Sequence, residues 1–105
     1  MKLINLTPHI INIITTNGVI DIPTSGTVAR CSQSNEQIAV INDIPVTKQV
    51  FGEVVDLPEP KEGTFYIVSR LVAAAVPERV DLLIPGPLVR CETGQPIGCN
   101  GLSVL

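Results

Sequence analysis

Short apolar segments alternate with turn-forming residues along the whole chain. The segments are rich in isoleucine, valine and threonine, which favour strands. Gly, Pro, Asn, Asp or Ser separates most segments from the next. The pattern predicts strands over residues 9–15, 19–23, 27–32, 37–42, 44–52, 64–68, 80–85, 88–91 and 97–105.

Two pairs of these segments are spaced as β-hairpins. Asn17-Gly18 separates the first pair, and Asn42-Asp43 separates the second. Both dipeptides readily adopt the positive φ angles that a tight hairpin turn requires. The sequence therefore predicts hairpin turns at these two places.

Three further stretches fall outside the strand pattern. Residues 32–37 (SQSNEQ) are expected to form a polar loop, and residues 56–63 (DLPEPKEG), with two prolines and four charges, a surface linker. Ser69 precedes the segment 70–76 (RLVAAAV), and its hydroxyl is suited to accept a hydrogen bond from the first turn of a helix. Pro77 ends that helix.

Many strands and one short helix indicate a mainly β protein. We expect an antiparallel barrel or sandwich with one short α-helix near residues 70–76. The alternative is an α+β arrangement with a β-α-β unit at residues 64–85, although the helix is short for a crossover, which usually needs about ten residues or more. Residues 1–105 are expected to form a single domain.

The composition points to association between copies. Hydrophobic residues make up 45% of the chain and charged residues only 16%, against about 25% in an average protein. The mean hydropathy of +0.38 is high for a small monomer, which has much surface to cover. We therefore expect a homo-oligomer in which copies bury apolar surface against one another.

The charge balance excludes some partners. A net charge of −3 argues against a binder of nucleic acid polymers, which needs a basic face, and three aromatic residues offer few platforms for stacking bases. No apolar run approaches the length of a membrane span, so no membrane partner is expected. A small nucleotide-like ligand remains compatible, because it needs only a few local cations.

The three cysteines cannot all pair within one chain. No secretory signal opens the sequence, so we expect a reduced, cytoplasmic protein with buried free thiols. A zinc site would have to combine Cys31, Cys91 and Cys99 with His9, and the close ligand spacing of zinc sites is absent. We expect no metal and no cofactor.

The start of the helix is the best local candidate for an anion site. Ser69 and Arg70 lie there together, directly after a strand that carries Tyr66. Helix N-termini attract anions, so Ser69 and Arg70 are candidates for binding phosphate and Tyr66 for stacking on a base or ribose. The alternative is a plain helix cap beside a solvated arginine.

Arg30 and Arg90 are further candidate cations. Each is followed by a cysteine within a strand-like segment, and alternation puts the two neighbours on opposite faces. If the cysteines point inward, the arginines point outward, where their planar groups suit phosphate. The alternative is that each arginine pairs with a surface carboxylate.

Catalytic motifs are absent, and we expect no enzyme activity. The chain has no GxSxG, HExxH, P-loop or GxGxxG sequence. His9, the only histidine, follows Pro8, which favours a bend there. We expect the His9 ring to tie this bend to a neighbouring carbonyl, and we retain His9 as a candidate ligand contact.

Three stretches of the chain resemble a family of small, uncharacterised proteins encoded by bacteriophages and prophages. They are NLTPH (5–9), IPTSGTVAR (22–30), and residues 51–90 together with 97–102. The resemblance implies a compact cytoplasmic protein made in the host cell and implies no particular reaction. Cys91 departs from the family pattern, in which an acidic residue often follows the arginine, and this argues further against a metal site there.

Phage proteins of this size that lack catalytic motifs often act by binding. One class forms oligomeric sponges that sequester nucleotide immune signals, such as cyclic oligonucleotides or cyclic ADP-ribose derivatives. By analogy, we expect a non-enzymatic binding protein that sequesters such a signal and counters host anti-phage defence. The alternatives are a protein–protein interaction module or minor phage structural or assembly protein, and a small nucleotide-cleaving enzyme with His9 as acid or base.

Overall fold

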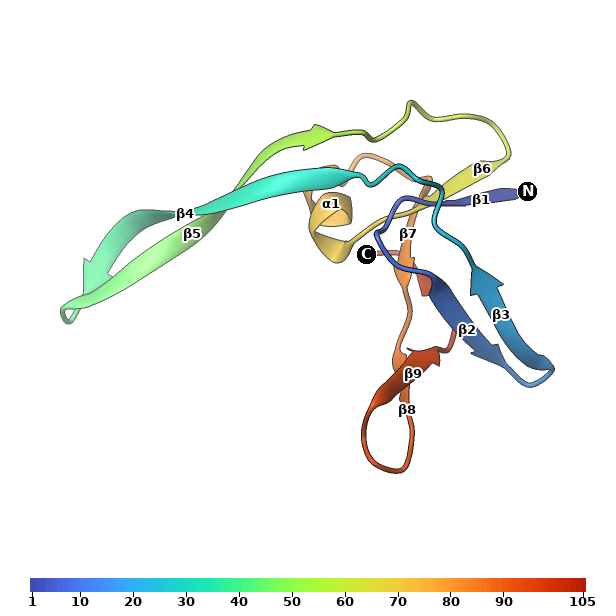
Figure 1. Ribbon diagram of the computed structural model, residues 1–105. Helices are drawn as coiled ribbons and strands as arrows, with labels where there is room; N and C mark the ends of the chain where they lie inside the picture. Colours follow the sequence, from blue (N-terminus) through green and yellow to red (C-terminus); the bar gives the residue numbers. More distant parts are fainter.

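The computed structural model describes residues 1–105 and is mainly β, with 52% of residues in strands and one short helix. This confirms the expected fold class, although the three sheets do not close into a barrel (Figure 1). The elements are β1 (Lys2–Asn5), β2 (Ile11–Thr15), β3 (Gly18–Ile22), β4 (Arg30–Ile41), β5 (Ile44–Val55), β6 (Thr64–Ile67), α1 (Arg70–Ala75), β7 (Leu82–Pro85), β8 (Leu88–Arg90), β9 (Pro96–Cys99) and β10 (Leu102–Ser103).

The first sheet has the order β1-β6-β7-β10 and is largely parallel. β6 pairs in parallel with both β1 and β7, and only β10 runs antiparallel to its neighbour. The expectation of an antiparallel architecture is therefore wrong for this sheet. β6, α1 and β7 form the β-α-β unit expected as the alternative over residues 64–85, because the connection over residues 68–81 is long enough to cross back even with a six-residue helix.

The second sheet has the order β3-β2-β9-β8 and combines two hairpins. β2 and β3 form the first predicted hairpin, with Thr15 opposite Gly18. The turn residues are Thr16 and Asn17, and the expected positive φ angle is found only at Gly18, the first residue of β3, where φ is 124°, and not at Asn17. β9 joins the two hairpins because it pairs in parallel with β2 at Ile13 and Cys99 and antiparallel with β8.

The third sheet is a single long hairpin, β4–β5, which we call the arm. Asn42 and Asp43 form its turn with φ angles of 50° and 63°, as predicted. The polar loop expected over residues 32–37 is wrong, because these residues continue β4 as part of a twelve-residue strand. Figure 1 shows the arm leaving the rest of the molecule, with its turn farthest from the body. A strand that is exposed on both faces needs no apolar alternation, so its sequence reads as a loop.

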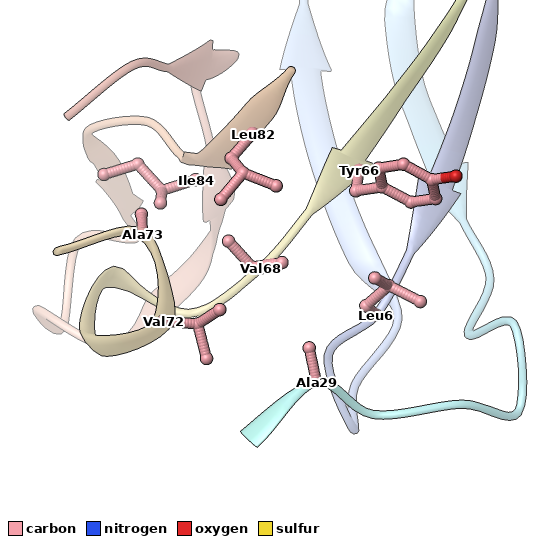
Figure 2. Close-up of a cluster of buried hydrophobic side chains, with 8 residues drawn as sticks. All are labelled: Leu6, Ala29, Tyr66, Val68, Val72, Ala73, Leu82 and Ile84. Carbon is pink, nitrogen blue, oxygen red and sulfur yellow. The ribbon is translucent and has the colours of Figure 1, made fainter. Parts of the chain in front are cut away.

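The core lies between the first sheet, α1 and the base of the arm. Eight buried residues form it: Leu6, Ala29, Tyr66, Val68, Val72, Ala73, Leu82 and Ile84 (Figure 2). A smaller cluster of Ile11, Ile13, Ile67 and Cys99 joins the first sheet to the second. Ile67 and Val68 are fully buried and belong to different clusters, so the end of β6 fixes both sheets relative to each other.

The linker over residues 56–63 forms no strand, as predicted, and an ion pair holds it. Arg79 donates two hydrogen bonds of 2.8 Å to the carboxylate of Asp81 and a third, of 3.0 Å, to the carbonyl oxygen of Pro58. These hydrogen bonds hold the pKa of the Asp81 carboxyl below its ordinary value and raise the pKa of Arg79. The pair therefore ties the linker to the start of β7.

Candidate functional site

The loop that follows β1 is fixed by the side chain of Asn5. This side chain is 1% exposed and uses both of its amide hydrogens, which it donates to the carbonyl oxygens of His9 (2.8 Å) and Ile22 (3.1 Å). Its oxygen accepts hydrogen bonds from the backbone N–H (2.9 Å) and the hydroxyl (2.6 Å) of Thr7. A short polar side chain that bonds two residues ahead builds a turn of its own. Asn5 therefore sets the path of residues 6–10.

His9 lies on this loop, two residues before β2 begins, and the predicted bend is present at residues 7–9. The expected tie is made differently, because the His9 backbone carbonyl receives the hydrogen bonds from Asn5 and Thr7, while the ring makes none within the chain. The His9 side chain is exposed. The loop thus holds its backbone and leaves the imidazole free.

Ser69 lies at the junction of β6 and α1. Its hydroxyl accepts a hydrogen bond of 3.3 Å from the backbone N–H of Val72, which confirms the predicted N-cap. The residue is exposed, whereas Val68 before it is fully buried. The hydroxyl oxygen is used as an acceptor, so its own hydrogen remains available to a ligand.

A cleft of about 680 Å³ brings His9 and Ser69 together. Its volume lies in the range of about 300–1,000 Å³ that is typical of small-molecule sites. Three parts of the chain line it: the loop after β1 with the start of β2, the end of β6, and the β7–β9 region. The lining residues are Thr7, Pro8, His9, Ile10, Ile11, Asn12, Val68, Ser69, Pro85, Leu88, Pro96, Ile97, Gly98 and Cys99.

Large, exposed apolar side chains make up part of the lining of this cleft. Ile10, Leu88 and Ile97 are 57%, 57% and 50% exposed, so they offer flat apolar contacts. The lining holds no aspartate, glutamate, lysine or arginine. An anion would therefore meet no carboxylate of the lining residues there, and its polar partners would come from the His9 ring, the Asn12 amide, hydroxyl groups and backbone N–H groups.

Gly98 allows β9 to lie close against β2 beside this cleft. A Cβ atom at this position would lie 2.7 Å from the carbonyl oxygen of Asn12. Only glycine lets β9 approach β2 this closely without moving the backbone. The neighbouring Cys99 is 3% exposed, and its thiol donates to the same carbonyl at 3.6 Å.

Tyr66 is not available as a stacking platform. Its ring is 3% exposed within the main core, and Figure 2 shows it among the apolar side chains there. Its hydroxyl donates a hydrogen bond of 3.4 Å to the carbonyl oxygen of Glu59 in the linker. The expectation that Tyr66 stacks on a base or ribose is wrong, because the sheet and the linker enclose the ring.

The three candidate arginines do not line the cleft. Arg70 follows Ser69 directly but lines a separate, smaller cleft of about 290 Å³ with Phe51 of the arm. Arg30 is exposed at the base of the arm, and Arg90 donates a hydrogen bond of 2.8 Å to the carbonyl oxygen of Gly94 in the loop after β8. None of the three arginines therefore belongs to the cleft that His9 and Ser69 line, although Arg70 is the next residue after Ser69.

The three cysteines are free, and none belongs to a cluster of residues that could bind a metal ion. No group of three or more His, Cys, Asp or Glu residues is placed to hold an ion. Cys31 packs against the main core while Arg30 points outward, as the alternation predicts. A hydrogen bond of 2.9 Å with the hydroxyl of Thr93 lowers the pKa of the Cys91 thiol below its ordinary value.

Sequence reasoning missed Asn5, Leu88 and Ile97 as parts of the site. The signal for Asn5 is its place in NLTPH, where a polar residue follows an apolar strand and precedes a threonine by two. Leu88 and Ile97 reach the cleft only because β8 and β9 join the sheet of β2. No local sequence pattern predicts that β9 pairs with β2.

Compared with known proteins, the chain matches no family model, no curated protein and no solved structure. The only helix has six residues, so the structure contains no helix that is long enough to cross a membrane.

Proposed function

We propose that this protein binds a small anionic ligand of the nucleotide type in the cleft between His9 and Ser69, without chemical change. The observation that carries this proposal is the cleft itself, which brings together two residues that are 60 positions apart and were both selected from the sequence. Ile10, Leu88 and Ile97 contact the faces of a base or ribose, and the Ser69 hydroxyl and His9 ring donate to phosphate.

The resemblance to phage proteins supports a particular class of ligand. A cyclic oligonucleotide or cyclic ADP-ribose derivative combines base and ribose rings with two or more phosphate groups, which suits a cleft lined by apolar side chains together with a few polar groups. A protein that sequesters such an immune signal needs no catalytic group. The host defence response is then blocked by removal of the free signal.

Thermal shift with a panel of cyclic nucleotides tests the proposal. A ligand that binds only the folded state raises the melting temperature as its concentration rises. Mass spectrometry of the ligand released by heating is expected to show an unchanged compound. A cleaved product would contradict binding without chemistry, and the absence of a shift with every nucleotide would contradict the ligand class.

Ser69→Asp locates the ligand within the protein. Aspartate caps a helix as well as serine, so the variant is expected to keep the wild-type melting temperature without ligand. It places a carboxylate in the cleft, and we expect nucleotide affinity to fall at least about tenfold, which corresponds to about 1.4 kcal/mol. Arg90→Ala is the matched control and is expected to bind as the wild type does. Equal binding by Ser69→Asp would place the ligand elsewhere.

The arm favours a second candidate function, a protein–protein interaction module or minor phage assembly component. It presents exposed apolar residues, including Ile38 and Ile44 at 58% and 62%, on a hairpin that packs on the body only near its base. Such surface usually meets another protein. If every nucleotide leaves the melting temperature unchanged and a defined host or virion protein binds the arm, this function replaces the first.

A further inference from the structure

The arm lacks the third strand that a hairpin of this length needs for stability. Its two strands pair only with each other, and most of their residues are exposed. The radius of gyration is 16.7 Å, against about 13 Å for a compact chain of this length. Because a lone two-stranded hairpin is marginally stable in water, the arm requires a partner along its length.

The exposed residues of the arm are apolar where the hairpin ends. Near its turn, Ile38, Val40, Ile41 and Ile44 are between 56% and 62% exposed. Only 14 of the 105 residues of the whole chain are buried. The isolated chain therefore leaves more apolar surface in water than a small monomer usually does.

The outer edge of β4 is the edge that is open to pairing. β4 contains no proline and no glycine over its twelve residues. The edge of β5 carries Pro45, which has no backbone N–H for an added strand, and Lys48, the charged residue type that most often protects strand edges. The unpaired N–H and C=O groups of β4 are thus a template for another strand.

The charges on β4 complement each other in a second copy of the same strand. Arg30 and Glu36 are the only charged residues of β4, and neither makes an ion pair within the chain, in which Arg79–Asp81 is the only ion pair. They are six residues apart on one face, because β4 is regular over this stretch and the extra residue of the first bulge lies on β5.

We propose that two copies of this chain pair antiparallel along β4, about a two-fold axis at Gln33. This register places Arg30 of each copy opposite Glu36 of the other, so the same ion pair forms twice. It joins the two arms into one four-stranded sheet. In this register Ile38 and Ile41 of each copy lie beside the segment that precedes Arg30 in the other copy. Their exposed apolar side chains are thereby removed from solvent.

Charge reversal tests this register. Sedimentation velocity at low ionic strength is expected to give the wild type a mass of twice 11.2 kDa, since exposed charge pairs act most strongly there. Arg30→Glu and Glu36→Arg each replace two attractive pairs by two repulsive ones, and each is expected to raise the dimer dissociation constant at least about tenfold. The double variant, Arg30→Glu with Glu36→Arg, restores both pairs and is expected to return to within about threefold of the wild type.

Glu53→Arg on β5 is the matched control, and it is expected to dimerise as the wild type does. Arg30, Glu36 and Glu53 all carry exposed side chains, so circular dichroism is expected to show the wild-type strand content in each of the four variants. A monomeric wild type, a double variant as weak as the single ones, or dissociation caused by Glu53→Arg would each overturn the proposal. The test needs no ligand, so its result is independent of the cleft.

Discussion

Replacement of Asn5 by alanine is the sharpest test of how the candidate site is held. The substitution removes four hydrogen bonds, two donated by the Asn5 amide to His9 and Ile22 and two accepted from Thr7. A hydrogen bond contributes about 0.5–1.5 kcal/mol net, and Thr7 is half-buried and regains part of its bonding from water. We therefore expect a loss of about 2–4 kcal/mol in the free energy of unfolding.

The measurement is urea unfolding followed by circular dichroism, with thermal unfolding beside it. For a domain of this size, a loss of 2–4 kcal/mol corresponds to a fall of roughly 8–30 °C in melting temperature. Asn5→Asp keeps the accepting oxygens but puts a buried carboxylate beside two carbonyl oxygens, so at neutral pH it is expected to destabilise at least as much as alanine does.

Asn12→Ala is the matched control for this prediction. Asn12 donates one exposed hydrogen bond of 2.6 Å to Asp21, so its loss is expected to cost no more than about 1 kcal/mol. If Asn5→Ala unfolds within about 0.5 kcal/mol of the wild type, the reasoning that Asn5 fixes the loop is refuted.

Three further predictions concern other parts of the chain. Because Arg79 lowers the folded pKa of Asp81, their pairing stabilises the fold fully above the unfolded pKa of about 3.9. This stabilisation is lost as the pH falls through the lower folded pKa. Asp81→Asn is therefore expected to be less stable than the wild type near neutral pH, and the difference is expected to shrink in unfolding curves measured in acid. Cys91, whose pKa is lowered, is expected to react first with iodoacetamide at neutral pH, and Cys99, which is 3% exposed, is expected to react only after denaturation. Peptide mass spectrometry measures the order of labelling, and simultaneous labelling of the two cysteines would contradict both assignments. Asp43→Gly is expected to stabilise the arm by up to about 1 kcal/mol, because φ is 63° there, and an unchanged or lower melting temperature would count against strain at this turn.

Features set by local chemistry could be predicted from the sequence. The turn at Asn42-Asp43 needs two residues that tolerate positive φ angles, and the start of α1 needs a hydroxyl at Ser69, and both are found where expected. The strand over residues 32–37 could not be predicted because it has no buried face within the chain, so its sequence shows no apolar alternation.

The parts of the site that depend on distant contacts could be predicted only in part. His9 and Ser69 were selected for local reasons, and the parallel pairing of β1 with β6 brings them together. Tyr66 was wrongly placed because it lies on β6, where Thr64, Tyr66 and Ile67 are all buried and no face remains open. A strand inside a parallel sheet is covered on both faces, and its sequence does not say which residues a ligand can reach.

The parallel pairing of β1 with β6 also fixes when the cleft forms during synthesis. His9 leaves the ribosome near the beginning of translation, but β1 has no partner until residues 64–67 follow it. The wall made by Leu88 and Ile97 comes later still. Contacts between such distant positions close large loops and form slowly. The residues of the arm are synthesised before Leu88 and Ile97, so the proposed pairing of two arms can begin before the proposed ligand site is complete.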